Sequence, residues 1–142
     1  MESITIANDV KTINEKAFQS ISTLKTVIIG STVQTIRDYV FTFCNNLESF
    51  SVGANNQGGY QAIDRVLFDK TSLIHYPQQK KDKTYVIPDG YTEIKGYAFY
   101  NNEYLDYVKL NDDITTIGDN AFEGVTNVRT ITLPQSLTLI RL

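Results

Sequence analysis

The residues that could carry out covalent or acid–base chemistry are few in this chain of 142 residues. There is one cysteine, Cys44, and one histidine, His75. A cysteine nucleophile needs a neighbouring base, and these two residues belong to different segments, so we expect Cys44 to be a small inward-facing apolar residue instead. His75 stands in an alternating stretch of a predicted hairpin, where we expect a strand surface. One cysteine and one histidine cannot assemble a zinc site of the usual composition, and no internal disulfide can form.

Two groups of charged residues have both a chemical and a plain interpretation. Asp112 and Asp113 could touch a cation, but the spacing and the glycine of a calcium loop are missing, so we interpret them as loop residues. The run 80–83 (Lys-Lys-Asp-Lys) is the only cationic cluster in a chain whose net charge is -3. Nucleic-acid binding requires a clustered cationic surface, so we predict a solvated loop and no nucleic-acid partner. The sequence has no phosphate loop, nucleophile elbow or metal motif, and we predict neither an enzyme nor a cofactor.

The elements that must position any functional residue are visible as an internal repeat. An aliphatic residue is followed four and five places later by a small residue and a phenylalanine, and this phrase occurs four times. The phenylalanines are 23, 58 and 23 residues apart, and a fixed period of this size indicates a solenoid of stacked coils. The four copies are Ile13 with Ala17-Phe18, Ile36 with Val40-Phe41, Ile94 with Ala98-Phe99, and Ile117 with Ala121-Phe122.

Six strand-like segments give a second marker of the same repeat. Their first inward residues are 23, 23, 35, 23 and 23 residues apart, so one coil is longer than the others. Alternation of apolar residues with others indicates strands with one face buried, and one strand per coil predicts a parallel sheet. The longer coil covers 53–84 and contains a predicted hairpin. The inward pairs are Ile4/Ile6, Val27/Ile29, Phe50/Val52, Tyr85/Ile87, Val108/Leu110 and Ile131/Leu133.

No single coil has enough inward residues for a core of its own, so we expect the stacking of neighbouring coils to drive folding. The phenylalanines should form an internal spine. Hydrogen-bonded strands lie about 4.8 Å apart, whereas a helix needs up to about 10 Å, so short helical turns at 15–19 and 119–123 would put the strands on the concave side of a curved stack. We thus predict an α/β fold with one domain over 1–142. A membrane span needs roughly 18 apolar residues, and no such run is present.

The wording of the coils resembles the leucine-rich repeats of the BspA-like family, which read L-x-x-I-x-L-P-x-x-V-x-x-I-G-x-x-A-F-x-x-C. The resemblance covers nearly the whole chain and implies a right-handed leucine-rich-repeat solenoid with about six short parallel strands. The chain departs from the pattern at Val40, and at Ile21, Asn102 and Val125, where the second coil has Cys44. The matching residues are Leu24-x-x-Val27-x-Ile29, Val33-x-x-Ile36 and Val40-Phe41-x-x-Cys44 in the second coil, and Ile114-x-x-Ile117-Gly118-x-x-Ala121-Phe122 with Ile131-x-Leu133-Pro134 further on.

The resemblance also implies a protein-binding module of a secreted or surface-displayed microbial protein, used in adhesion or host interaction. Its partner would be a protein or glycoprotein, in the host's extracellular space. The alternative is an intracellular or structural scaffold that organises other proteins. The sequence begins directly in a strand without a signal peptide, and neither end has the polar cap of a complete solenoid. We therefore expect a portion of a longer array, whose open ends could associate end to end.

Comparison of the coils with one another predicts one candidate binding surface. Four tyrosines of one coil occupy outward positions where the other coils mostly carry polar residues, and a lysine stands beside the last of them. Tyrosine offers a large, rigid contact area and is enriched in protein interfaces. The alternative is sequence drift, since scattered exposed apolar residues are normal. Phe43 is a similar outlier in the second coil and could instead cover the longer coil. The predicted partner-binding residues are Tyr97, Tyr100, Tyr104, Tyr107 and Lys109.

Overall fold

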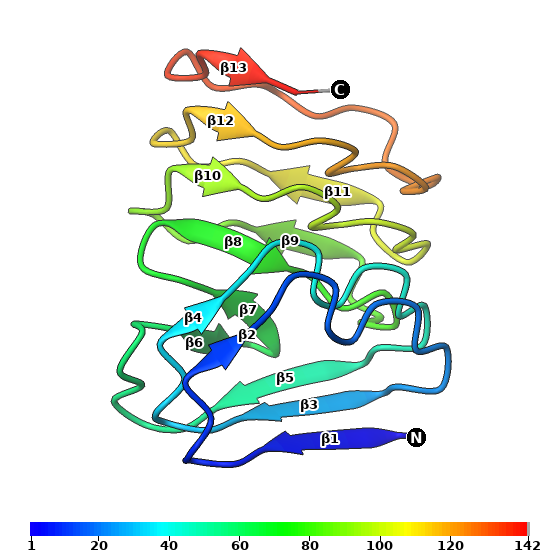
Figure 1. The fold of residues 1–142 in the computed structure, drawn as a ribbon. Coiled ribbons are helices and arrows are strands. Elements are labelled where there is room, and N and C mark those ends of the chain that lie inside the picture. Colours follow the sequence, from blue (N-terminus) through cyan, green and yellow to red (C-terminus); the bar gives the residue numbers. More distant parts are fainter. Residues whose placement is uncertain (142) are drawn as a thin grey trace.

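The chain forms a stack of coils, described over residues 1–141 by a computed structural model with thirteen short strands. Four coils each contribute one strand of three or four residues and one strand of two residues. The two kinds of strand lie on different sides of the stack, and the two ends of the chain lie at its opposite ends (Figure 1). A repeating coil of this kind is the architecture that the period of 23 residues predicts.

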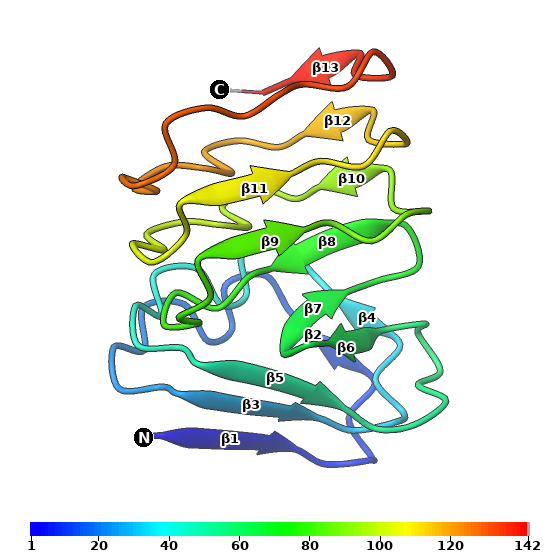
Figure 2. The ribbon, with the colours of Figure 1, turned by 180° about the vertical axis from the view of Figure 1, so that it is seen from behind.

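The longer strands build two parallel sheets on one side of the stack (Figure 2). Ile4 pairs with Val27, and Val27 pairs with Phe50, so the hydrogen-bonded register advances by one sequence repeat at each step. The parallel strands predicted from the alternating pattern are therefore confirmed. One sheet contains β1 (Ser3–Ile6), β3 (Thr26–Ile29) and β5 (Ser49–Val52), and the other contains β9 (Thr84–Val86) and β11 (Tyr107–Lys109).

The two-residue strands form a second side that sequence analysis did not predict as strands. The first four of them end on the aliphatic residue that opens the repeated phrase, at Ile13, Ile36, Ile94 and Ile117. Two residues are too few to show the alternation that identifies a strand. β2 (Thr12–Ile13) pairs only with β4 (Thr35–Ile36), whereas the later ones continue as a parallel ladder. This ladder begins with the four-residue strand β8 (Ser72–His75) and continues with β10 (Glu93–Ile94), β12 (Thr116–Ile117) and β13 (Leu139–Ile140).

The longer coil interrupts the stack with a hairpin. β6 (Gln61–Ile63) and β7 (Val66–Phe68) pair in antiparallel fashion, and β7 then pairs antiparallel with β8. At the hairpin tip, Asp64 and Arg65 both have positive φ angles of 47° and 68°, as a two-residue hairpin turn of the primed type requires. The hairpin lies between β5 and β9, so the two sheets of longer strands do not join (Figure 2).

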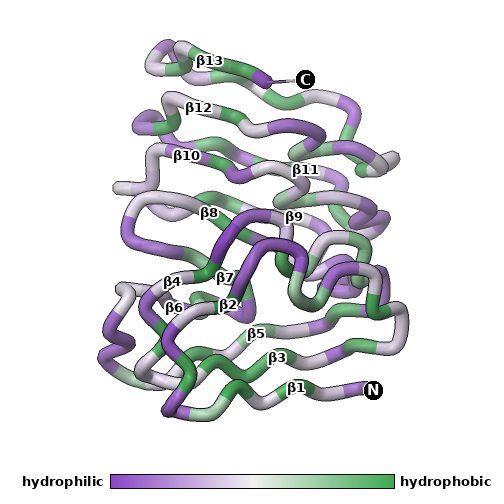
Figure 3. Tube along the Cα trace, viewed as in Figure 1, coloured by the Kyte–Doolittle hydropathy of each residue, from purple (hydrophilic) through white to green (hydrophobic). Residues whose placement is uncertain are grey.

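The apolar interior is accordingly divided into two clusters rather than shared by all coils. β7 lies at the boundary, where Leu67 belongs to the cluster of the N-terminal coils and Val66 and Phe68 belong to the other. Successive side chains of a strand point to opposite faces, so the side chains of β7 can pack into both clusters. Figure 3 shows the hydrophobic residues along the strands and the hydrophilic ones mainly in the connecting turns.

The phenylalanine spine is present within each half of the stack. Phe18 stacks on Phe41 with ring centroids 5.9 Å apart, and Phe99 stacks on Phe122 at 4.9 Å. Tyr76 extends the second pair, because its ring stacks on Phe99 at 5.1 Å. Phe41 and Phe99 are almost completely buried, which confirms that these rings face the interior, although the hairpin separates the two stacks.

The predicted helical turns are wrong, since the described residues contain no helix. In each copy of the repeat, the segment around the phenylalanine has two residues with positive φ, four positions apart, and left-handed residues at that spacing prevent a right-handed helix. The predicted curvature of the stack depended on helices wider than strands, so it has no physical basis in a stack without helices. The first set is Lys16 (φ 59°), Tyr39 (61°), Tyr97 (57°) and Asn120 (52°), and the second is Ser20 (62°), Phe43 (65°), Asn101 (56°) and Gly124 (75°).

The sixth predicted strand, at Ile131 and Leu133, is also wrong, because this segment is irregular. Alternation favours a strand only where a neighbouring strand supplies hydrogen bonds, and this segment forms no ladder with β11. Across the part of the chain that the structure describes, no helix is long and apolar enough to cross a membrane.

Candidate functional site

Two of the five predicted partner-binding residues, Tyr97 and Tyr100, are half-buried in an aromatic cluster. The ring of Tyr97 lies edge to face with Tyr39 at 5.8 Å and with Phe43 at 5.5 Å. Phe43 also meets Tyr100 at 5.1 Å. The amide of Asn120 donates a hydrogen bond of 2.8 Å to the Tyr97 hydroxyl. We call Tyr39, Phe43, Tyr97 and Tyr100 the aromatic bridge.

The aromatic bridge joins two coils that are not consecutive. Tyr39 and Phe43 belong to the second coil, whereas Tyr97 and Tyr100 belong to the coil that follows the longer one. The contact is close, because a Cβ atom placed on Gly96 would lie 3.3 Å from the Tyr39 ring. Packing between these two coils therefore explains why Tyr97, Tyr100 and Phe43 are aromatic where other coils carry polar residues. The comparison of coils had suggested Phe43 as a cover for the longer coil.

Tyr104 is also held by the scaffold. Its hydroxyl donates to the side-chain carbonyl of Gln79 at 3.1 Å, and its backbone N–H donates to Asn102 at 2.9 Å. The ammonium group of Lys81 lies 6.0 Å from the centre of its ring. Tyr104 thus ties its own coil to the loop that precedes β9.

Tyr107 and Lys109 are the two predicted residues that lie open on the sheet of longer strands. Val108 between them is buried, whereas 49% of Tyr107 is exposed. In the parallel register Tyr107 pairs with Thr84 and Lys109 pairs with Val86 of β9, and Val86 is 58% exposed. We call these four outward residues of β9 and β11 the tyrosine face.

Two hollows flank Tyr107. One, of about 480 Å³, is lined also by Asp106, Arg129 and Thr130. The other, of about 250 Å³, is lined also by Lys109 and Thr132, among others. Tyr107 thus lines both hollows as an exposed aromatic residue. Tyr107 and Lys109 lie on β11, whereas Tyr97 and Tyr100 lie in the turn that contains Phe99, so the five predicted residues come from different parts of the coil.

The candidate nucleophile and base do not form a catalytic pair. Cys44 is fully buried in the N-terminal cluster, where its thiol donates to the carbonyl of Phe18 at 3.1 Å. Burial raises the pKa of the Cys44 thiol, against two backbone hydrogen bonds that lower it. A thiol whose pKa is raised carries little of the reactive thiolate. Cys44 therefore has the role of a small apolar residue that its repeat position predicts.

His75 is buried, and its predicted place on a strand surface is wrong. Its ring nitrogen Nε2 lies 3.1 Å from the side-chain oxygen of Gln78, and its ring packs edge to face on Phe50 at 5.6 Å. Burial lowers the pKa of His75 to about 4, and the hydrogen bond to Gln78 offsets this only in part. The imidazole is thus neutral near pH 7. β8 is an inner strand, flanked by β7 and β10, which the sequence pattern did not reveal.

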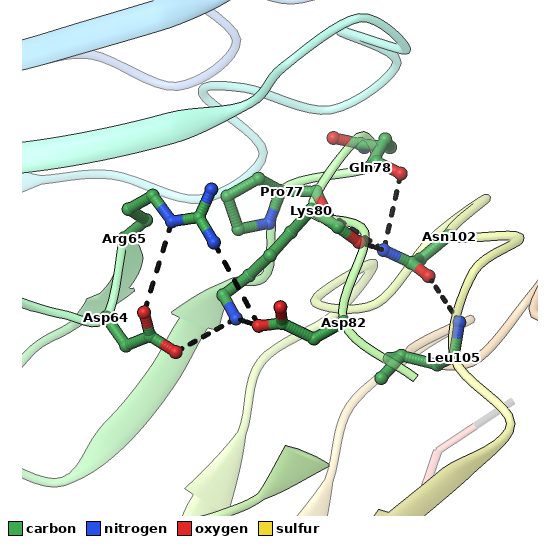
Figure 4. A network of polar contacts seen from close by, with 8 residues as sticks. All are labelled: Asp64, Arg65, Pro77, Gln78, Lys80, Asp82, Asn102 and Leu105. Carbon is green, nitrogen blue, oxygen red and sulfur yellow. Dashed lines mark hydrogen bonds and ion pairs between the residues drawn. The ribbon is translucent and has the colours of Figure 1, made fainter. Parts of the chain in front are cut away.

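The run 80–83 is not uniformly solvated as predicted, because the Lys80 side chain is fully buried. Its ammonium group contacts Asp82 and lies 3.0 Å from Asp64, at the tip of the hairpin (Figure 4). It also lies 5.2 Å from the centre of the Tyr76 ring and 5.8 Å from that of Tyr85. Lys80 thus links the hairpin to the loop before β9, while Lys81 and Lys83 are exposed.

The backbone of this loop is fixed by one buried amide. The Asn102 amide group donates to the carbonyls of Pro77, Gln78 and Lys80, at 3.1, 3.3 and 3.1 Å. Its oxygen accepts from the N–H of Leu105 at 3.0 Å (Figure 4). Asn102 stands at the position of Cys44 in the repeat, and its departure from the pattern has this structural reason.

The acidic pair Asp112 and Asp113 is exposed, in a turn as predicted. Asp113 accepts a hydrogen bond of 3.0 Å from the N–H of Gly90, and its own N–H donates to Asn111 at 2.7 Å. These contacts link two neighbouring coils. Among residues 1–141, no three histidine, cysteine or acidic side chains gather in an arrangement that could hold a metal ion.

A groove that sequence analysis missed lies where the two halves of the stack meet. It has a volume of about 320 Å³ and runs along the ends of the two-residue strands. One wall is the segment 36–42, which begins at the end of β4 and rises towards β8 in Figure 1. The opposite side consists of Asp69, Ile74, His75, Glu93, Lys95, Gly96, Gly118, Asp119 and Arg141. We call this feature the junction groove. Only the presence of a longer coil in the sequence could have signalled it.

The stacked coils, with open polar and aromatic surfaces, define a repeat solenoid of the kind that presents extended binding surfaces. A family model described as "BspA type Leucine rich repeat region (6 copies)" matches residues 1–84 and 78–141. The chain therefore belongs to the BspA-type leucine-rich repeat family. No curated protein matches it.

Solved structures share the fold. A leucine-rich repeat protein from Eubacterium ventriosum has a TM-score of 0.91 at 29% identity, over 98% of this chain and 37% of that one. The pneumococcal vaccine antigen PcpA has a TM-score of 0.84 at 26% identity, over 96% of this chain and 40% of that one. A leucine-rich cell surface protein from Faecalibacterium prausnitzii has a TM-score of 0.72 at 23% identity, over 99% and 50%. The chain thus spans half or less of the length of these proteins.

Proposed function

We propose that this chain is the protein-binding repeat module of a cell-surface or secreted microbial protein and that it acts in adhesion or host interaction. Leucine-rich repeats of this family generally mediate protein–protein interactions. One similar protein, PcpA, is a vaccine antigen, which supports display outside the cell. The partner in this proposal is a protein or glycoprotein, and the chain itself carries out no catalysis.

The tyrosine face is the proposed contact surface. The observation that carries this choice is the 49% exposure of Tyr107, while Tyr97, Tyr100 and Tyr104 are held against other parts of the scaffold. An exposed, rigid tyrosine ring is the kind of group that is enriched at protein interfaces, and Val86 and Lys109 lie on the same face of the two strands. We assign Tyr97, Tyr100 and Tyr104 to packing within the scaffold rather than to direct contact with a partner.

Binding of variants to host cells and to extracellular matrix tests the proposal. Tyr107→Ser combined with Lys109→Ser should weaken binding at least tenfold and leave the melting temperature unchanged, because both side chains are exposed. The matched control is Tyr100→Ser, which should lower the melting temperature but retain binding below it. Equal binding by the double variant and the unchanged chain would reject the tyrosine face.

The alternative, an intracellular scaffold, differs in a feature of the full-length gene. An export signal together with a wall or membrane anchor supports the surface-displayed module. Capture of the chain's partner from a cell lysate, with no binding to matrix or intact host cells, would favour the scaffold.

End-to-end self-association is a further part of the proposal. It is supported by the exposed apolar residues at one end of the stack, where Leu139 is 44% and Ile140 is 51% exposed on β13. An edge strand with apolar side chains is a template for another chain. Light scattering at high concentration should detect oligomers that Leu139→Lys abolishes, and a monomer at all concentrations would contradict this part.

A further inference from the structure

The turns that contain the phenylalanines are joined from coil to coil by a ladder of backbone hydrogen bonds. At two junctions, three alternate N–H groups of one coil donate to carbonyls of the next, over distances of 2.8 to 3.3 Å. The number of residues between donor and acceptor is the same at both junctions, so the ladder is a regular property of the stack. The donor and acceptor pairs are Lys16 with Asp38, Phe18 with Val40, Ser20 with Thr42, Tyr97 with Asp119, Phe99 with Ala121 and Asn101 with Glu123.

This ladder is missing at the junction between the second coil and the longer coil. The equivalent donors there are the N–H groups of Tyr39, Phe41 and Phe43, and none of them has an acceptor within residues 1–141. At the other junctions the phenylalanine N–H donates to the residue just before the equivalent ring of the next coil. Tyr76 is the equivalent ring of the longer coil, because it stacks on Phe99. The Phe41 N–H would therefore meet the carbonyl of His75. His75, however, pairs in antiparallel fashion with Leu67 of β7. The hairpin has thus diverted the strand that would otherwise complete the ladder.

Tyr39 and Phe41, whose backbone N–H groups are unpaired within residues 1–141, are among the residues that line the junction groove. A backbone N–H group left without an acceptor away from water is costly, so a ligand that supplies carbonyl oxygens here gains hydrogen bonds that the fold leaves open. The two donors are spaced two residues apart. Carbonyl groups along one edge of an extended peptide have the same two-residue spacing, and addition of such a peptide to open backbone groups is an established mode of recognition.

The charges of the groove favour a peptide over a polyanion. Its walls carry Arg37, Lys95 and Arg141, together with Asp38, Asp69, Glu93 and Asp119. Lys95 is already paired with Glu93 at 3.3 Å, and Asp69 accepts backbone N–H groups of Thr71 and Ser72. Arg37 and Arg141 have no ion pair within the described chain. Carboxylates in the walls repel a nucleic acid or a sulfated glycan, whereas a peptide with an acidic side chain can pair with either arginine.

We propose that the junction groove binds an extended peptide segment of a partner protein, through backbone hydrogen bonds to Tyr39 and Phe41 and charge pairing with Arg37 and Arg141. This site is separate from the tyrosine face, because none of the residues that line it lies on β9 or β11. It is therefore independent of the contact surface proposed above, and the two can be tested separately.

Amide hydrogen exchange on the whole chain tests the open ladder directly. The N–H groups of Tyr39 and Phe41 should exchange at least tenfold faster than those of Tyr97 and Phe99, which occupy the same repeat positions and are hydrogen bonded. These two pairs are matched controls within one molecule. Equal protection of both pairs in the free chain would overturn the proposal.

Selection from a displayed library of random dodecapeptides tests the ligand class. The expected result is a set of peptides whose affinity falls at least tenfold in the variant that combines Arg37→Glu with Arg141→Glu, both exposed positions. The same peptides should be unaffected by Arg129→Glu, an equal change of charge beside Tyr107. Bound peptide should also slow exchange at Tyr39 and Phe41. The proposal is overturned if no peptide depends on Arg37 and Arg141, if bound peptide leaves these two amides unprotected, or if every selected peptide is lost only in Tyr107→Ser.

Discussion

The rings of Tyr39 and Tyr97 meet edge to face with their centroids 5.8 Å apart, although they occupy the same repeat position in two coils that are not consecutive. Both residues have positive φ angles, so their side chains project from equivalent turns. The longer coil lies between the two turns in the sequence, and its hairpin divides the interior into two clusters. The aromatic bridge is therefore a direct side-chain link between the two halves of the stack.

A double-mutant cycle should detect this link. Phe43→Asn and Tyr100→Thr introduce residues that other coils carry at these positions, so the local backbone is preserved. Aromatic pairs of this geometry contribute about 0.5–1.5 kcal/mol beyond their buried area, and we expect a coupling free energy of that size in urea denaturation. The control cycle pairs Phe43→Asn with Tyr107→Ser, which should be additive. Additive effects in both cycles would show that the bridge does not couple the halves.

The left-handed positions give a prediction about backbone strain. Ser20 has a φ angle of 62° and is exposed, and the equivalent residue of the last coil is Gly124. Because a left-handed conformation costs a residue with a Cβ atom about 1–2 kcal/mol, Ser20→Gly should stabilise the chain by up to about 1 kcal/mol after the extra entropy of the unfolded glycine is deducted.

The control for this change is Ser22→Gly in the next exposed turn, where φ is not positive. This variant should lose up to about 1 kcal/mol, because glycine adds only unfolded-state entropy there. Thermal and urea denaturation measure both variants. A loss of stability in Ser20→Gly equal to that in Ser22→Gly would contradict the strain.

The sequence predicted the features that depend on inward residues repeated at a fixed interval. The spacing from Ile4 to Val27 to Phe50 is the register of the sheet, because stacking buries equivalent residues on one another. The turns were mispredicted, since the residues at 15–19 favour a helix by composition, whereas the backbone bonds to the neighbouring coil instead. Asn101, Asn120 and Gly124, which tolerate left-handed φ angles, were the available signal.

The burial of His75 and Lys80, and the junction groove, could not be predicted in the same way. All three depend on where the hairpin lies, and the longer coil occurs once, so no second copy in the chain reveals which of its residues face inward. The tyrosines illustrate the same difference. Comparison of coils identified Tyr97 and Tyr107 as outliers, but only the arrangement in space separates a residue that packs between coils from one on an open sheet.

Lys80 provides a test of the buried charge. Its side chain is fully buried against Tyr76 and Tyr85, so Lys80→Met should be neutral or stabilising, because an apolar residue of similar volume avoids the cost of desolvating the ammonium group. Asp64→Asn combined with Asp82→Asn should instead cost about 3 kcal/mol, since it leaves a buried cation without its carboxylates. Urea denaturation compares the variants.

The opposite ranking of these Lys80 and aspartate variants would mean that the ion pair itself stabilises the fold. A matched control is Lys83→Met, which removes an equal charge from an exposed side chain of the same loop. Its free energy of unfolding should stay within about 0.5 kcal/mol of the unchanged chain.

His75 should make the chain sensitive to mild acid. The folded state holds the imidazole neutral with a pKa of about 4, against an ordinary value of 6.5. Below pH 6.5 the unfolded chain therefore binds a proton that the folded chain does not, and the free energy of unfolding falls as the pH drops. The loss continues until the pH reaches about 4 and then levels off. A shift of this size corresponds to about 3 kcal/mol in total.

The measurement is urea denaturation between pH 7 and pH 4, and the comparison is His75→Leu. His75 is the single histidine of the sequence, so the variant removes all imidazole titration and keeps every carboxylate. Its free energy of unfolding should fall less steeply over this range, and the difference between the two curves isolates the histidine. Parallel curves would show that the imidazole accepts a proton in the folded state, which the packing against Phe50 and the hydrogen bond to Gln78 argue against.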